Sequence, residues 1–148
     1  MITETLMTFV IGFEGFVSCA YPDGSQWSNG FGTKARSRWE CIDEVEAKKR
    51  MKSHMELDSQ HVKLIFKNVK QHEHDSLVSY CYNMGRGGCA DVVKLAAQGK
   101  KDVAARLMRQ HVKKGSGQEE GLTRRRLAEV AMLTKPEVRK TCIYQEYS

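Results

Sequence analysis

The placement of glycine and proline constrains the fold of this chain more than any other feature of its sequence. Between positions 21 and 33, turn-forming residues alternate with aromatic ones, a pattern that breaks helices and is typical of short hairpin strands. From about position 43 onward, apolar residues instead recur at helical spacing. Strands gathered in one N-terminal segment, with helices elsewhere, predict an α+β fold. The turn formers are Pro22, Gly24, Gly30 and Gly32.

Six helices and one hairpin region are expected. The longest helix spans positions 43–62, where Ala47, Met51, Met55 and Val62 form one apolar stripe. Asp43 should cap its start, with Glu46 reaching back in a capping box. Start and stop signals place the others at Thr3 or Thr5 to Phe13, at 75–82 before Gly85, at 91–99, at 102–115, and from Thr123 to before Pro136.

Composition narrows the class of protein. The 148 residues, 41% apolar and 28% charged, fit one domain or two small lobes that share a core. The longest apolar stretch, 6–17, is too short to cross a bilayer and follows no Lys/Arg cluster, so we expect neither a transmembrane helix nor a signal peptide. Five cysteines without paired spacing predict free thiols and a cytoplasmic start.

The net charge of +6 predicts attraction to a polyanion. Nucleic acid, anionic lipid and the anionic bacterial envelope all fit this charge. Arg86-Gly87-Gly88 is a single copy and reads as a loop, whereas His72 and His74 read as a solvated helix start rather than a metal site. Charge alone therefore leaves the partner open.

Two carboxyls carry the chemistry that the sequence suggests. Glu14 lies at the C-terminal end of an apolar helix, where the helix dipole disfavours a negative charge by about 0.3–1 kcal/mol. Phe13 and Phe16 should desolvate it and raise its pKa, as a general acid requires. Asp23 follows nine positions later in a turn, where solvent would keep it ionised. Such a pair is typical of a glycosidase, although a surface Glu and an ordinary turn Asp would give the same spacing.

Three segments of the chain carry a family resemblance. Glu14-Gly15, Tyr21, Asp23 and the run 27–33 resemble the active-site signature of the bacteriophage lysozyme and endolysin family, glycoside hydrolase family 24. The segments 74–85 and 121–129 resemble two further blocks of that family, in the same order. Three ordered blocks are far more specific than one short motif.

The resemblance implies an architecture and an activity. We expect a two-lobed lysozyme-like fold, in which a long helix joins a small N-terminal β-hairpin lobe to a larger helical lobe. Residues 1–148 would form a single catalytic domain without a separate wall-binding domain. The implied enzyme is an endolysin or muramidase that hydrolyses, with inversion, the β-1,4 bond between N-acetylmuramic acid and N-acetylglucosamine in peptidoglycan. No metal or organic cofactor is implied.

The resemblance also assigns roles. Glu14 would be the general acid, Asp23 would stabilise the cationic transition state or assist the attacking water, and Ser28 would take the place of a family Thr that orients this water. Ser keeps the hydroxyl donor and acceptor, but it lies one residue closer to the Asp, and Asn29 follows where the family usually has Ile. One Arg of 124–126 would position Glu14, and the others would form structural ion pairs.

The biological setting follows from the same resemblance. The enzyme would be a monomer that stays in the host cytoplasm until a holin gives it access to the wall in the periplasm, where it serves host lysis. A virion-associated role remains open. The rivals are a non-catalytic envelope-binding relative, a basic nucleic-acid binder and a lytic transglycosylase.

Overall fold

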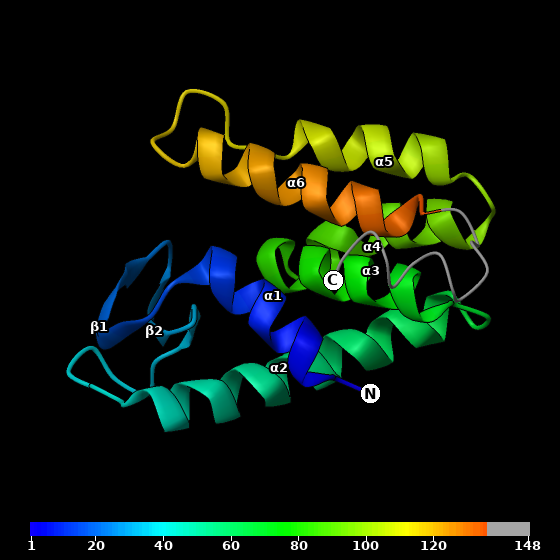
Figure 1. Cartoon of the computed structure of the whole chain (residues 1–148). Coiled ribbons are helices and arrows are strands. Elements are labelled where there is room, and N and C mark those ends of the chain that lie inside the picture. Colours follow the sequence, from blue (N-terminus) through cyan, green and yellow to red (C-terminus); the bar gives the residue numbers. More distant parts are fainter. Residues whose placement is uncertain (136–148) are drawn as a thin grey trace.

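The computed structural model describes residues 1–135 and confirms the α+β class. In this range, six helices accompany one three-stranded antiparallel sheet in the order β1-β2-β3 (Figure 1). The elements are α1 (Glu4–Glu14), β1 (Val17–Asp23), β2 (Gln26–Gly30), β3 (Thr33–Lys34), α2 (Glu44–Ile65), α3 (Gln71–Met84), α4 (Arg86–Ala97), α5 (Lys101–Gln110) and α6 (Glu119–Leu133).

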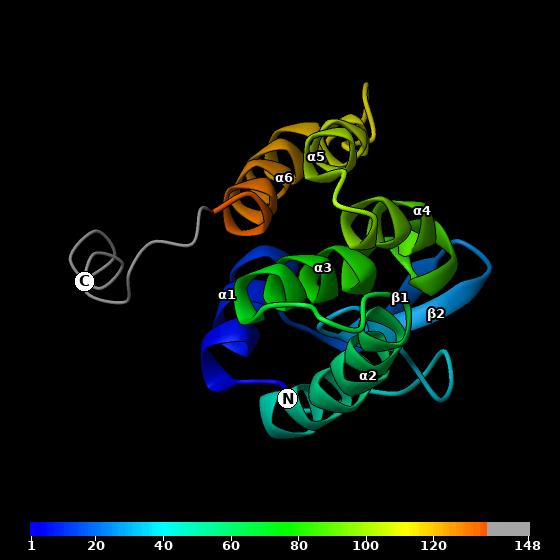
Figure 2. The same cartoon turned by 90° about the vertical axis from the view of Figure 1, so that its right-hand side faces the viewer.

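Two lobes are joined by α2, as the resemblance implied. The sheet lies at one end of the molecule, and α2 runs from beneath it to the far side of the helical lobe (Figure 1). The central helix is α3, which contacts α1, α2, α4 and α6 (Figure 2). Because α3 is surrounded by other helices, it has little freedom to move. Hydrogen bonds to α3 can therefore hold residues of the neighbouring helices in fixed positions.

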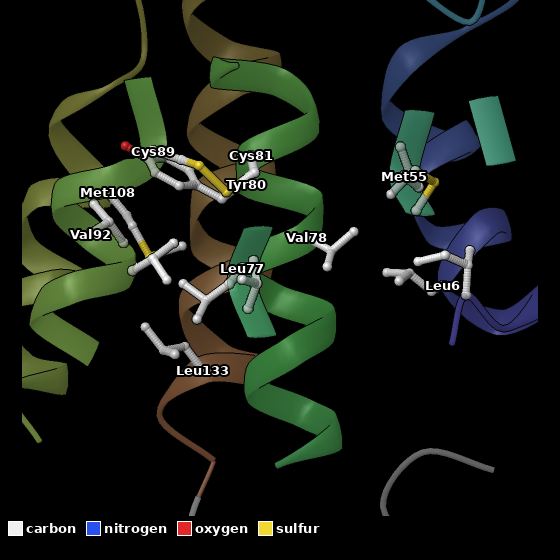
Figure 3. Packing of buried hydrophobic residues seen from close by; sticks show 14 of the residues in the cluster. Leu6, Met55, Leu77, Val78, Tyr80, Cys81, Cys89, Val92, Met108 and Leu133 are labelled. Atoms are coloured by element: carbon white, nitrogen blue, oxygen red, sulfur yellow. A yellow bond between two sulfur atoms is a disulfide. The ribbon is translucent and has the colours of Figure 1, made fainter. Parts of the chain in front are cut away.

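The hydrophobic core lies around α3. Leu77, Val78 and Tyr80 are fully buried and pack toward side chains from the surrounding helices (Figure 3). Met51 and Met55 of α2 are fully buried too, which confirms the predicted apolar stripe. Each such side chain contributes roughly 1.5–3 kcal/mol by leaving water.

A tight hairpin places Asp23 and Ser28 close together. Asp23 pairs with Gln26 across the turn, and Ser28 pairs with Tyr21 two positions further along the strands, on the same face. At Gly30, where φ is +62°, a Cβ atom would come within 3.1 Å of the Ala47 side chain. Glycine is therefore what lets the end of β2 pack directly against α2.

The helix ends agree with the sequence signals only in part. Thr3 caps α1 and Gly15 ends it, and the Asp43 carboxylate accepts from the Glu46 N–H at 2.9 Å. Glu46 does not complete the predicted capping box, because its carboxylate bonds to Arg50 instead. The helices α3 to α6 each begin before the predicted residue, and α5 ends at Gln110 rather than near 115. Arg86 and the two glycines after it lie in the first turn of α4, so the predicted loop there was wrong.

The prediction of free thiols was also wrong. Cys19 is bonded to Cys41, and Cys81 to Cys89, whereas Cys142 lies outside the described residues. Tertiary structure explains the pairing: an isolated β-bridge brings the first two Cα atoms to 3.9 Å, and the α3–α4 turn brings the second pair to 5.1 Å (Figure 3). Disulfides persist in oxidising compartments, so the cysteines no longer argue for a cytoplasmic start.

The histidines at the start of α3 are not solvated, contrary to prediction. His74 is buried between Ser59 and Asp75, and His72 bonds through Nδ1 to the Met132 carbonyl. Within residues 1–135, no cluster of His, Cys, Asp and Glu is arranged to hold a metal ion. Nor does any helix in that range have the length and apolar character needed to cross a membrane.

Candidate active site

A cleft of about 590 Å³ lies between the sheet, the C-terminal end of α1 and the beginning of α6. Both predicted carboxyls line it, although they come from different secondary-structure elements. Its lining is rich in charged and polar groups, as a site for a hydrated polymer such as a glycan requires. The residues discussed below that line it are Glu14, Tyr21, Asp23, Gly32, Tyr82, Asn83, Lys113, Gln118 and Arg125.

Glu14 is the last residue of α1, and its side chain is only 16% exposed. Its Oε1 atom accepts a hydrogen bond from Nη1 of Arg125 in α6. Its Oε2 atom lies beside Gly32, where an added Cβ would come within 3.3 Å. The expected apolar neighbours are thus only part of the setting of Glu14, because a guanidinium contacts its carboxylate directly.

Arg125 is held by a buried network that reaches the central helix. The guanidinium donates to the Ser79 carbonyl at 2.9 Å and to the Glu129 carboxylate at 3.2 Å. Glu129 is fully buried and also accepts from the Ser79 hydroxyl at 2.5 Å and from Arg126. Arg125 is itself only 3% exposed, so it has little freedom to move away from Glu14. This confirms the hypothesis that one Arg of the triplet contacts Glu14.

The neighbouring Arg126 fixes a different cleft residue. Its guanidinium lies 4.8 Å from the Tyr80 ring centroid and donates to the His111 carbonyl and to Oδ1 of Asn83. Arginine can only donate hydrogen bonds, so the Asn83 oxygen must face it. The amide nitrogen of Asn83 is then left to donate elsewhere, and Asn83 is one of the residues that line the cleft.

Asp23 is held from within its own hairpin. The Ser28 hydroxyl donates to Asp23 Oδ2 at 2.7 Å and accepts from the Gln26 amide at 3.0 Å. Ser28 is fully buried behind Asp23, whereas Asp23 itself is exposed. Asn29, which stands where the family usually has Ile, also has a structural role. Its amide donates to Glu40 and ties the following loop to the sheet.

Two tyrosines add polar groups to the cleft. Tyr82 of α3 donates to the Phe31 carbonyl at 2.6 Å and so links the helical lobe to the β2–β3 turn. Burial is the main cause that raises the pKa of Tyr82, and the charge of Glu14 adds to it. The pKa of Tyr21 is raised by burial and by the charges of Asp23 and Glu14. Both phenols therefore remain neutral hydrogen-bond donors near neutral pH.

Several cleft residues were not singled out from the sequence. Tyr82 and Asn83 lie in the segment 74–85 that carries part of the resemblance, which is the signal that could have found them. Lys113 adopts φ +49°, a conformation uncommon for a residue with a side chain, in the turn before α6. Gln118 contacts Lys113, and neither residue gave a sequence signal.

Comparison with known proteins places the chain in a family. The family model for phage lysozyme matches residues 11–129. The muramidase domain of SpmX from Asticaccaulis excentricus is similar in structure, with a TM-score of 0.79 and 21% identity over 92% of this chain and 99% of that one. The endolysin of Escherichia coli phage FAHEc1 gives a TM-score of 0.72 and 25% identity over 95% and 97% of the two chains.

A lysozyme of phage P22 gives a TM-score of 0.69 and 20% identity over 90% of this chain and 97% of that one. No curated protein sequence matches this chain. The matches cover nearly the whole length of these solved chains, so the two-lobed fold is shared from end to end. Because the family model spans most of the sequence, including Glu14 and Asp23, the chain belongs to the phage lysozyme family and is a glycoside hydrolase of the lysozyme type.

Proposed function

We propose that this lysozyme hydrolyses the β-1,4 bond between N-acetylmuramic acid and N-acetylglucosamine in bacterial peptidoglycan. The observation that carries the proposal is the convergence of Glu14 and Asp23 on one cleft. The two carboxyls differ in their surroundings: the first is mostly buried and the second is exposed. A pair of carboxyls in different environments is what acid-assisted glycoside hydrolysis needs.

Glu14 is the general acid in this proposal. Arg125 occupies its Oε1 atom, so we assign proton delivery to the glycosidic oxygen to Oε2, beside Gly32. The absence of a side chain at Gly32 leaves room for the sugar to approach this atom. Arg125 acts as a positioning residue, since it touches Glu14 and is itself buried.

Asp23 is the second carboxyl. It stabilises the positive charge that develops on the sugar ring or assists the attacking water, and inversion results when that water attacks directly. Ser28 is a positioning residue for Asp23, because its hydroxyl bonds to the carboxylate from a buried site. This assignment keeps the hydroxyl of the family Thr but has it act through Asp23.

The proposed setting is that of an endolysin. The chain acts as one catalytic domain and as a monomer. It stays in the host cytoplasm until a holin permits passage to the wall, where it causes host lysis. Peptidoglycan is the proposed partner, and no cofactor is part of the proposed reaction.

The test is hydrolysis of purified peptidoglycan by the wild type and by Glu14→Gln, with Glu56→Gln on an exposed face of α2 as the matched control. New reducing ends and loss of turbidity are both followed. Wild-type and control activity, lost in a folded Glu14→Gln variant, would support the proposal. Clearance with anhydro-sugar products would instead identify a lytic transglycosylase, and binding without either signal would identify a non-catalytic relative.

A further inference from the structure

An exposed basic and aromatic surface lies away from the cleft. Loop 34–39 begins at the last residue of β3 and carries Arg38 and Trp39, the latter 77% exposed. The Arg38 guanidinium lies over the Trp39 ring, 4.5 Å from its centroid. In Figures 1 and 2 the chain after β3 lies on the opposite side of the sheet from the α5–α6 connection. A partner bound to this loop would therefore leave the cleft open.

The base of the loop is firmly anchored. The Ala35 N–H donates to the Trp27 carbonyl at 2.8 Å, which ties the loop to β2. Glu40 receives two hydrogen bonds from Arg50 of α2, at 2.7 and 2.9 Å. Those bonds hold the pKa of Glu40 down at about 2, so it stays ionised and in place. Because these hydrogen bonds fix the base of the loop, Trp39 is held in its exposed position.

A groove of about 370 Å³ separates this loop from α2. Lys34, Arg36, Lys49 and Arg50 all line it. Arg50 is already paired with Glu40 and Glu46. The other three cations have no acidic partner within salt-bridge distance in the described range 1–135, so the groove carries excess positive charge.

Exposed apolar side chains flank these cations. Leu57 lines the groove and is 46% exposed. Val45 is 78% exposed and lies four residues before Lys49, on the same face of α2. Together with Trp39 on the loop, they are exposed apolar side chains that would gain free energy by leaving water. Nucleic acid would match the charge but would gain little from Val45 and Leu57.

We propose that loop 34–39 and the adjoining face of α2 dock on the surface of an anionic phospholipid membrane. Tryptophan prefers the boundary between headgroups and acyl chains, and lysine and arginine attract anionic headgroups within a Debye length. The aliphatic stems of Lys34 and Lys49 can lie along apolar surface while their charges stay in water. This surface binds peripherally, without a spanning segment, and independently of the proposed hydrolysis.

The test uses co-sedimentation of the full chain with vesicles of phosphatidylglycerol and phosphatidylcholine, against phosphatidylcholine alone. The variant is Lys34→Gln with Arg36→Gln and Lys49→Gln. Its control is Lys94→Gln with Arg106→Gln and Arg109→Gln, which removes the same charge from exposed residues of α4 and α5. We expect the partition coefficient on anionic vesicles to fall at least tenfold in the variant and less than twofold in the control. Peptidoglycan hydrolysis by both triple variants serves as the check on folding.

Tryptophan emission adds a readout specific to the loop. The chain has two tryptophans, so Trp39→Phe leaves only Trp27 as an emitter. A vesicle-induced blue shift that disappears in Trp39→Phe would support insertion of this loop. Equal weakening of both triple variants, or no binding to anionic vesicles, would overturn the proposal. So would tight binding to duplex DNA that depends on the loop cations while vesicles are not bound.

Discussion

The two carboxyls of the cleft are held in contrasting ways. Asp23 accepts from Ser28, five positions away in the same hairpin. Glu14 accepts from Arg125, 111 positions away, and that arginine is fixed by Glu129 and the central helix. The wall of the cleft formed by the sheet therefore depends on one local turn. The wall formed by the helices depends on the folding of the whole helical lobe.

The largest effect should follow from removing the charge that supports the helical wall. Glu129→Gln leaves the guanidiniums of Arg125 and Arg126 buried with less compensation, and we expect a loss of about 3–5 kcal/mol in the free energy of unfolding. Denaturant unfolding measures this loss. The exposed Glu44→Gln is the control, and equal stability of the two variants would show that the buried network is not essential.

The next effect concerns activity. Arg125→Gln removes the group that orients Glu14, so we expect kcat/KM to fall roughly 100-fold. Arg124→Gln, at an exposed position, should leave kcat/KM unchanged. Equal kcat/KM values in Arg125→Gln and the wild type would contradict the positioning role.

A buried carboxyl that accepts no hydrogen bond from an arginine of the described residues gives a third case for this comparison. Asp58 is fully buried, its oxygens have no hydrogen-bond partner among residues 1–135, and burial raises its pKa from 3.8 to about 7. The folded state therefore favours the protonated form, and stability should fall as the pH rises from 4 to above 7. Asp58→Asn should remove this loss and gain at least about 1.4 kcal/mol at pH 8, the value of one pKa unit.

Unfolding of both proteins at pH 4 and pH 8 measures the effect. The two should be similar in stability at pH 4, where the Asp58 carboxyl is protonated in the folded state. His54 Nε2 lies 3.7 Å from Asp58 Oδ2, but burial lowers the pKa of His54, so this imidazole is not a cation at pH 8. If the difference in the free energy of unfolding between the wild type and Asp58→Asn were the same at pH 4 and pH 8, this account would be contradicted.

The smallest effect should come from the sheet wall. Ser28→Ala removes one hydroxyl from Asp23, and we expect kcat/KM to fall three- to tenfold, or about 0.7–1.4 kcal/mol. Ser28→Thr should restore most of the activity because it keeps the hydroxyl. A loss in Ser28→Ala as large as that in Glu14→Gln would show that Ser28 itself takes part in the chemistry.

Much of the fold was predictable because its signals are local. Thr3, Gly15 and Asp43 mark helix ends through contacts within a few residues, and the α2 stripe follows from periodicity. The starts of α3 to α6 were misplaced, because none of these helices has Ser, Thr, Asp or Asn at its N-cap position. At α4, for example, the first turn is Arg86 followed by two glycines, which read locally as a loop.

The sequence by itself predicted the α+β class, since turns and helix periodicity are local properties, and its resemblance to a family pointed to the two carboxyls and to the hydroxyl of Ser28. Only the tertiary structure decided which arginine meets Glu14 and which cysteines pair. It likewise brought Tyr82 and Asn83 into the cleft. Those contacts join residues distant in sequence or on different elements. Packing around α3 fixes most of them, and the β-bridge between Cys19 and Cys41 brings that pair together.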